Sequence, residues 1–330
     1  MTREPTVLLL SHSQEPFCTE RVAGALRARG ARVLRVDTDE FPGRLDLRGE
    51  LEPGRGARLM LADEALVVDA VWLWRLWPAR LDERLSAGHR EAGQRESGTA
   101  LRGLLDLLGD AAWIDPIDRN RAADSKTRQL RLADALGLVI PPTLITGEPA
   151  AARRFFAAHD GQVVAKLQTS LGYTLAGGGG LPTRLLRPAD LDALDGLRHC
   201  PMVFQRYVPK ACELRIAWVD GQALVGALDG ARCGVDWRHE STATWEPHIL
   251  PDAVHQRLAA LMQRLGLRQG AIDMIVTPTG EYVFLEVNPA GEWGMLERDL
   301  GLPIGEALAA ALLRLASAPR GGEREDSCTR

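Results

Sequence analysis

Two apolar segments near the C-terminal end carry the polar residues that are best suited to chemistry. Asp273 interrupts the run Ala271-Ile-Asp-Met-Ile-Val276, and a second run, Leu285-Glu-Val-Asn-Pro289, carries a Glu and an Asn. The intervening Thr277-Pro-Thr-Gly280 is typical of a turn, so we expect an antiparallel hairpin. Two carboxylates and an amide oxygen form a hard ligand set that suits magnesium together with nucleotide phosphates. The segments therefore predict a metal–nucleotide site.

The register of this hairpin decides how close the carboxylates lie. If the turn closes the hairpin symmetrically, Asp273 faces Phe284 on the partner strand. Side chains alternate along a strand, so Phe284 and Glu286 would share the sheet face of Asp273, and Asn288 would follow on that face. Asp273 and Glu286 would be diagonal neighbours with Cβ atoms roughly 7–8 Å apart. A solvated polar face is the plainer interpretation, but carboxylates buried in apolar strands without a counter-charge would be strongly destabilising.

Three cations stand in apolar or small-residue contexts and complement the acidic hairpin. Lys166 ends the run Val163-Val-Ala-Lys, Arg215 follows Leu214, and Lys126 lies in the first turn of an expected helix, where it opposes the helix dipole. Lys126 and Lys166 could neutralise phosphates, and Arg215 could stabilise a transferring phosphoryl group. Taken singly, each of these residues would also fit a solvent-facing position. Their occurrence together with the acidic hairpin favours a role in phosphate binding.

A short segment between two expected strands, Phe204-Gln-Arg-Tyr-Val-Pro209, could hold a nucleotide base. Its apolar side chains could flank an adenine while backbone groups read the edge of the base. Glu213 shares strand parity with Arg215 and could accept hydrogen bonds from ribose hydroxyls. The alternative is a plain connecting loop beside a surface Glu. The candidate base-binding residues are Gln205, Arg206, Tyr207 and Val208.

The N-terminal part predicts an α/β domain. A strand at residues 6–10, a helix at 18–29 and a strand at 31–36 form one βαβ unit. A further strand is expected within residues 66–77, a helix at 91–108 and a strand at 112–115. The first loop lacks G-x-G-x-x-G, which disfavours a nicotinamide or flavin enzyme.

The remaining elements are expected to position the site. We expect helices at residues 124–137, 150–158, 258–265 and 304–315, with Asp124 or Ser125 as the first cap. Expected strands are residues 162–167, 202–207, 214–219, 270–276 and 281–287. Gly177-Gly-Gly-Gly180 predicts a mobile loop, and residues 319–330 predict a disordered tail.

Composition excludes several classes of protein. With 330 residues and 45% hydrophobic content, the chain can bury a core for two or three subdomains. Its formal charge of −4 is spread along the chain, which makes nucleic acid an unexpected partner. Five cysteines without C-x-x-C spacing argue against a disulfide framework or a zinc site and favour the cytoplasm. No apolar run predicts a membrane span or a signal segment, so we expect a soluble, unprocessed protein.

The ordered set of site residues resembles the ATP-grasp superfamily. More narrowly, the chain resembles the microviridin or graspetide ligases, which form side-chain ester or amide rings in ribosomally made peptides. The resemblance covers about residues 6 to 316. The carrying segments are Val7-Leu-Leu-Leu-Ser11, Arg35-Val-Asp-Thr-Asp-Glu-Phe-Pro42, Trp72-Leu-Trp-Arg75, Ser125-Lys126, Glu213-Leu-Arg215, Asp236-Trp-Arg238 and Leu285-Glu-Val-Asn-Pro-Ala-Gly-Glu-Trp293.

The resemblance implies an α/β ATP-grasp fold in three parts. These are an N-terminal Rossmann-like pre-ATP-grasp domain (1–118), a central lid subdomain (119–200) and a C-terminal catalytic subdomain (201–318). It implies ATP and Mg²⁺ as cofactors, a precursor peptide with a leader and an acidic core as partner, and a homodimer. The implied reaction is phosphorylation of an Asp or Glu side chain, followed by attack of a Ser or Thr hydroxyl or a Lys amine.

The resemblance also assigns roles to individual residues. Arg215 would stabilise the acyl phosphate. Beside the resemblance, Arg238 could meet the incoming carboxylate or be an exposed, salt-bridged arginine, and His239 next to it could accept a proton. Gln205 departs from the pattern, because many members of the superfamily carry a glutamate there. The implied magnesium ligands are Asp273, Glu286 and Asn288, the implied phosphate ligands are Lys126 and Lys166, and the implied ribose ligand is Glu213.

Two other functions remain open at this point. One is ligation of a free amino acid to a carboxylate, as in the RimK-like glutamate ligases and glutathione synthetases. The other is a non-catalytic nucleotide-binding scaffold. Such a protein would have no need of the complete set formed by Asp273, Glu286, Asn288, Lys126, Lys166 and Arg215. Separately, the run Trp72-Leu-Trp-Arg-Leu-Trp77 raises the hypothesis that Arg75 holds an acidic peptide segment while tryptophans pack around it. Core tryptophans beside a surface arginine are the simpler account.

Overall fold

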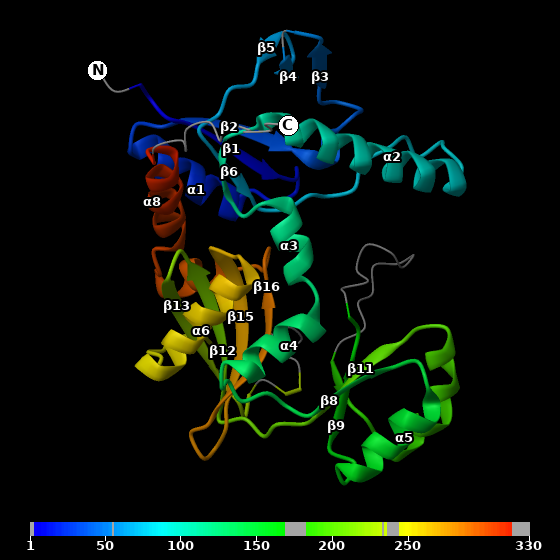
Figure 1. Ribbon diagram of the computed structural model, residues 1–330. Helices are drawn as coiled ribbons and strands as arrows, with labels where there is room; N and C mark the ends of the chain where they lie inside the picture. Colours follow the sequence, from blue (N-terminus) through cyan, green and yellow to red (C-terminus); the bar gives the residue numbers. More distant parts are fainter. Residues whose placement is uncertain (1–2, 55, 169–182, 233, 236–243, 319–330) are drawn as a thin grey trace, which may run out of the picture. The chain divides into compact units, whose positions relative to one another are not determined.

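The computed structural model divides the chain into two compact units. Unit 1 comprises residues 1–120, 292–297 and 303 onward, and unit 2 comprises residues 121–291 and 298–302. The structure describes residues 3–54, 56–168, 183–232, 234–235 and 244–318. Figure 1 shows the helices and strands of both units, which are described separately below. The predicted mobile glycine segment and disordered tail lie outside the described residues.

A four-stranded parallel sheet forms the centre of unit 1. Its order is β2-β1-β6-β7, with β1 at Thr6–Ser11, β2 at Arg32–Asp37, β6 at Ala70–Leu73 and β7 at Ala112–Ile114. Helix α1, Phe17–Ala28, connects β1 to β2 and confirms the predicted βαβ unit. The apolar run of β1 is buried throughout, as expected for a parallel sheet covered on both faces. Within the predicted strand 66–77, only the four residues of β6 pair with the sheet.

Helices cover the sheet of unit 1. Leu101 and Leu105 of α2 (Ala87–Leu105) pack into one core cluster with Leu8 and Leu10 of β1. Helix α8, Ile304–Ala316, packs against α1, β6 and β7. The final helix was predicted from its local pattern, and the C-terminal subdomain at 201–318 stays a prediction. The helix pattern is local, whereas the choice of packing partner depends on the tertiary fold.

Unit 1 also contains elements that the sequence did not predict. An antiparallel sheet is formed by β3 (Leu47–Glu52), β4 (Gly56–Leu61) and β5 (Glu64–Ala65). Two 3₁₀ helices span Thr38–Glu40 and Asp106–Leu108. Helix α3, Ile117–Ala123, follows β7.

The first sheet of unit 2 is antiparallel and four-stranded. Its order is β10-β9-β11-β8, with β8 at Thr143–Thr146, β9 at Val163–Lys166, β10 at Arg184–Leu185 and β11 at Met202–Arg206. Helix α5 (Pro149–Ala158) and a 3₁₀ helix at Pro188–Arg198 supply residues to its core. Strand β11 pairs with β8 and β9, and the subdomain boundary at residue 200 stays a prediction.

The second sheet of unit 2 has five strands in the order β14-β13-β12-β15-β16. The bounds are β12 Cys212–Val219, β13 Gln222–Asp229, β14 Glu246–Pro247, β15 Gln269–Val276 and β16 Tyr282–Asn288. Helices α4 (Lys126–Ala135) and α6 (Asp252–Leu265) cover its apolar face, and α7 spans Gly294–Leu300. Alternation along β12 and β15 sends apolar side chains to the helices and polar side chains to the opposite face.

The described helices show no candidate for a membrane span. The longest of them, α2, has 19 residues and is amphipathic and charged rather than uniformly apolar.

Candidate functional site

The two predicted carboxylates meet on the hairpin of β15 and β16. Asp273 pairs directly with Glu286, whereas Met274 pairs with Phe284, so the register shifts between these two pairs. The shift leaves Leu285 as an extra residue on β16, which is a β-bulge. The prediction that Asp273 faces Phe284, with Glu286 a diagonal neighbour, is therefore wrong. Directly opposed residues have Cβ atoms about 4.5–5.5 Å apart, closer than the diagonal arrangement.

The bulge also separates Phe284 from the polar face. Phe284 is fully buried in the core beneath the sheet, together with Met274 and Val287. Leu285 and Glu286 both line the cavity on the opposite face. A regular strand would have placed Glu286 on the face of Phe284, because residues two apart share a face. The expectation that Phe284 shares the face of Asp273 is wrong for the same reason.

Asn288 and Arg215 complete the hydrogen bonding of the acidic pair. Asn288 Nδ2 donates to Asp273 Oδ2 over 3.3 Å and to Glu286 Oε1 over 3.2 Å. Arg215 on β12 pairs in register with Asp273 and donates to its Oδ1 over 2.7 Å. Both partners of that ion pair are about 95% buried. The three predicted metal ligands therefore lie together, with Arg215 beside them.

Two lysines converge on Glu286. Lys126 is the first residue of α4, after the cap Ser125, and its Nζ donates to Glu286 Oε2. Lys166, at the end of β9, has its Nζ 3.9 Å from the same oxygen. Burial would raise the pKa of Glu286, but the charges of Lys166 and Lys126 and the hydrogen bonds from Lys126 and Asn288 lower it to about 2. Glu286 is therefore an anion held between two cations.

A cavity opens on this polar face of unit 2. Its wall includes apolar side chains from β9, β15 and β16, as well as charged ones. Glu213 lines it, and so do Lys166, Asp273 and Glu286, as predicted. The lining residues are Pro141, Val164, Lys166, Thr183, Gln205, Arg206, Tyr207, Val208, Lys210, Glu213, Val235, Asp273, Ile275, Leu285 and Glu286.

The predicted base-binding segment borders this cavity, with one departure. Its residues up to Arg206 belong to β11, within the predicted strand at 202–207, but Phe204 is buried in the core under that sheet. Phe204 therefore does not flank the cavity. Gln205 lines the cavity, and its Nε2 donates to Thr143 Oγ1 over 2.9 Å.

One charged residue of the cavity, Lys210, was not predicted from the sequence. Lys210 Nζ donates to Glu213 Oε2, and both side chains are largely buried. The pair lies in the loop before β12 and at the start of that strand. The sequence feature that could have pointed to Lys210 is the rarity of its residue type, since the chain has only three lysines.

The described residues fit a magnesium–nucleotide complex. Two carboxylates and an amide supply oxygen ligands on one face, which is the donor set that magnesium prefers. Lys126 and Lys166 lie beside them and could pair with phosphate oxygens. Arg238 and His239, which were expected near the reacting carboxylate, lie outside the described residues.

Unit 1 contains the run of tryptophans and Arg75. Trp72 and Trp74 are both buried and stack with ring centroids 5.3 Å apart. The Arg75 guanidinium lies over Trp74, 4.7 Å from its ring centroid, and donates to Glu292 Oε2 over 3.2 Å. Trp74 also meets Trp293 edge to face at 5.9 Å. The tryptophans are thus core residues, and Arg75 already holds a carboxylate of its own chain.

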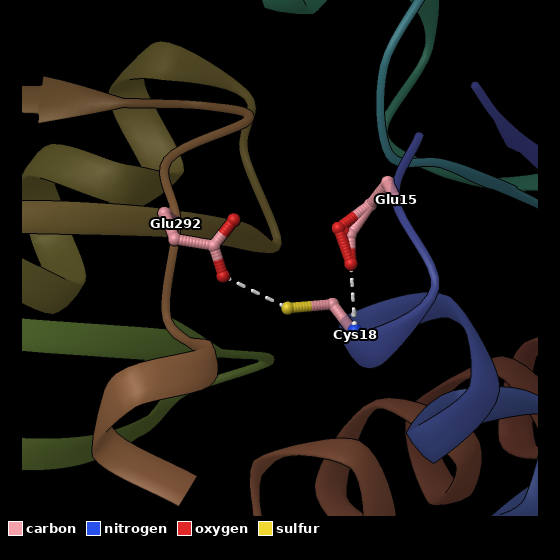
Figure 2. A group of neighbouring side chains, drawn as sticks. All are labelled: Glu15, Cys18 and Glu292. Atoms are coloured by element: carbon pink, nitrogen blue, oxygen red, sulfur yellow. Dashed lines mark hydrogen bonds between the residues drawn. The ribbon is translucent and has the colours of Figure 1, made fainter. Parts of the chain in front are cut away.

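Glu292 belongs to a group of three side chains whose ligand atoms lie close enough together to hold a metal ion. Glu15, Cys18 and Glu292 each place one ligand atom within 4.8 Å of the others, and Figure 2 shows them turned toward one another. Cys18 Sγ donates to Glu292 Oε1 over 3.0 Å, and Glu15 Oε1 accepts from the Cys18 amide over 2.8 Å. Burial and the neighbouring Glu292 raise the pKa of the Cys18 thiol. These hydrogen bonds hold the first turn of α1 through Glu15 and Glu292, so we assign the group to packing of α1.

Comparisons with known proteins show which family and fold the chain resembles. The family model of the MvdD pre-ATP-grasp domain matches residues 6–121. The chain is 42% identical to the macrocyclase MdnB from Microcystis aeruginosa MRC, covering 94% of this chain and 99% of that one, with a TM-score of 0.80. A comparison with curated proteins finds no match.

Two further solved structures contain peptides. The chain is 35% identical to the macrocyclase MdnC of the same organism, bound with precursor peptide MdnA, covering 94% and 99% of the two chains with a TM-score of 0.84. It is 30% identical to a RiPP-associated ATP-grasp ligase from Chryseobacterium gregarium, covering 96% and 98% with a TM-score of 0.84. That ligase is in complex with ADP and a leader and core peptide.

Proposed function

Because the chain belongs to the family of ATP-grasp ligases that modify ribosomally made peptides, we propose that it closes rings within a precursor peptide. In this proposal the chain uses ATP and Mg²⁺ to activate Asp or Glu side chains. It then joins them to Ser or Thr hydroxyls or to Lys amines. The observation that carries the proposal is the Asp273–Glu286 pair, flanked by Lys126, Lys166 and Arg215.

The first proposed step is phosphoryl transfer to the peptide. A carboxylate oxygen of the peptide attacks the γ-phosphorus of ATP, the bond to the β–γ bridging oxygen breaks, and ADP leaves. Bound Mg²⁺, with Asp273, Glu286 and Asn288 as ligands, would neutralise charge on the phosphates. Lys126 and Lys166 hold phosphate oxygens in position, so that little reorganisation is needed during transfer.

The second proposed step forms the ring. A hydroxyl or amine of the peptide attacks the acyl carbon, and inorganic phosphate leaves as its bond to that carbon breaks. Arg215 stabilises the negative charge that develops on the acyl phosphate. His239 remains the proposed acceptor of the proton of the nucleophile, and Arg238 the proposed partner of the incoming carboxylate.

The binding roles assigned to the cavity wall are part of the same proposal. Glu213 accepts hydrogen bonds from the ribose hydroxyls, and the segment from Gln205 to Val208 contacts the adenine. The peptide, rather than a free amino acid, is favoured as the substrate because MdnC and the Chryseobacterium ligase are both complexed with precursor peptides. A homodimer also remains a prediction, which analytical ultracentrifugation would test.

The direct test uses the purified chain with ATP, Mg²⁺ and the peptide encoded by a neighbouring short reading frame. Ring formation removes one water for each bond, so we expect a peptide that is lighter by that mass, together with a matching amount of ADP. Tandem mass spectrometry then locates the linked Asp or Glu. A peptide that gains the mass of an amino acid would instead identify an amino-acid ligase, and an unchanged peptide without ADP would contradict the proposal.

A further inference from the structure

Two of the proposed magnesium ligands lie in a weakly held part of the second sheet of unit 2. Strand β16 ends the sheet order, so its outer edge pairs with no other strand of the described residues. Glu286 and Asn288 follow the bulge at Leu285, and β16 ends at Asn288. A bulge interrupts the ladder of backbone hydrogen bonds, and an edge strand presents backbone groups without a partner strand. The positions of both ligands therefore need support from outside the sheet.

Gln129 of α4 gives this support at Val287, the residue between the two ligands. Its Oε1 accepts from the Val287 amide over 2.8 Å, and its Nε2 donates to the Val287 carbonyl over 2.7 Å. The side chain thus pairs with both backbone groups of Val287, as a neighbouring strand would. Nε2 also donates to the carbonyl of Ala123, at the end of α3, over 2.7 Å. These bonds hold a side chain on a residue that is only 1% exposed.

The start of α4 also carries Lys126. Gln129 follows Lys126 by three residues, so both side chains lie on one face of the helix. Lys126 binds the Glu286 carboxylate, and Gln129 binds the backbone of the next residue. Val287 packs in the core beneath the sheet, whereas Glu286 lines the cavity on the opposite face. The helix therefore holds this part of β16 both by its backbone and by its carboxylate.

We propose that Gln129 is a positioning residue that keeps Glu286 and Asn288 in place to bind the metal ion. This inference rests on the proposed ATP- and Mg²⁺-dependent function. Gln129 is buried and is not among the described residues that line the cavity, so it acts through the backbone of Val287. Removing a group that orients metal ligands typically weakens metal binding by about 10- to 100-fold.

The test measures the dissociation constant of Mn²⁺ from the complex of the full chain with ADP, by electron paramagnetic resonance. Mn²⁺ takes the same oxygen ligands as Mg²⁺. Gln129→Met keeps a side chain of similar length and volume but makes none of the hydrogen bonds, and we expect it to raise the Mn²⁺ dissociation constant about tenfold or more. Glu286→Gln gives the reference for a lost ligand. The affinity for ADP without metal, measured by calorimetry, should be unchanged in Gln129→Met.

Leu130→Ala is the matched control. Leu130 is the next residue of α4 and is buried in the core under the same sheet. Its substitution removes apolar packing but no side-chain hydrogen bond to β16. We expect Leu130→Ala to lower the Tm and to keep the wild-type Mn²⁺ affinity, because a general loss of stability does not displace the ligands of a protein that remains folded.

A second variant and a measurement on the wild type apply if Gln129→Met does not fold. Gln129→Asn keeps the amide but is one methylene too short to reach Val287, so it should also weaken Mn²⁺ binding. In the wild type, hydrogen exchange followed by NMR should show the Val287 amide to be as protected as that of Phe284, which donates to the Val139 carbonyl over 2.8 Å. Rapid exchange at Val287 with slow exchange at Phe284 would show that the anchor is absent.

The outcomes separate the inference from the function on which it rests. Wild-type Mn²⁺ affinity in folded Gln129→Met or Gln129→Asn, with Glu286→Gln impaired, overturns the role of Gln129 alone. An equal loss of affinity in Leu130→Ala overturns it as well, because the loss then follows from weakened packing. A wild type that binds ADP but no Mn²⁺ shows that the metal assignment is wrong. A wild type that binds no ADP contradicts the proposed function, and the inference fails with it.

Discussion

Asp273 and Glu286 are cross-strand partners because a β-bulge places Leu285 between the Phe284 pair and the Glu286 pair. The bulge allows Phe284 to fill the core while the next two residues face the cavity. The carboxylates thus share one oxygen-rich face, and Asn288 donates to both. A bulge beside an active site is a common way to redirect a side chain.

The acidic pair should be essential for turnover. We expect Asp273→Asn and Glu286→Gln each to lower ring formation roughly a thousandfold, because each removes metal-binding charge worth several kcal/mol. Mass spectrometry of the peptide would measure the rate, and circular dichroism would verify that the variants remain folded. A folded variant of either kind with near-normal activity would show that the metal assignment is wrong.

ATP should stabilise the protein against heat, and more so with Mg²⁺. A ligand bound only by the folded state raises the free energy of unfolding by about 2.7 kcal/mol when present at about 100 times its dissociation constant. Differential scanning fluorimetry with ATP, ATP with Mg²⁺, and NAD would measure the shift in Tm. A larger shift with NAD than with ATP would be inconsistent with an ATP-grasp nucleotide site.

Arg75 should contribute to peptide use rather than to ATP binding. It lies over Trp74 and binds Glu292, so an acidic peptide side chain would have to share or replace that carboxylate. Lysine cannot reproduce the paired bonds of a guanidinium. We expect Arg75→Lys to raise the KM for the peptide roughly tenfold while the ATP dissociation constant is unchanged.

The control for Arg75 is an arginine paired within the same unit. Arg29 binds Glu306 of α8 and is more exposed than Arg75, so Arg29→Lys should leave both constants unchanged. If Arg75→Lys also leaves peptide turnover unchanged, Arg75 acts only in packing against Trp74 and Glu292.

Acid should destabilise the protein in part through Glu286. Its pKa is about 2 in the folded protein, against an ordinary value of 4.5. A carboxylate whose folded pKa is depressed stabilises the fold above its unfolded pKa, and this contribution is lost as the pH falls toward the folded pKa. As the pH falls from the ordinary value to the folded value, the free energy of unfolding of the wild type should fall by on the order of 3 kcal/mol more than that of Glu286→Gln. Urea denaturation at a series of pH values measures the free energy of unfolding of both proteins. If the two free energies fall equally with pH, the low pKa of Glu286 is wrong.

Most elements of both units follow from local patterns. The βαβ unit of unit 1, the cap Ser125 and the hairpin strands were predicted because apolar periodicity and turn residues act over a few positions. The β3–β5 sheet was not predicted, since its strands are short, largely exposed and lack a clear apolar alternation. The final helix was predicted from its periodicity, whereas its packing against α1, β6 and β7 cannot be read from a local pattern.

The sequence by itself indicated most charged side chains of the candidate site, Lys210 excepted, because charged residues that interrupt apolar strands are visible without coordinates. Alternation then sufficed to bring Glu213 and Arg215 to one face. Only the tertiary structure decided that Asp273 faces Glu286, because one extra residue in a strand reverses every later side chain. It likewise decided that Lys210 turns inward to Glu213, since the sequence does not fix where the side chain of a loop residue points.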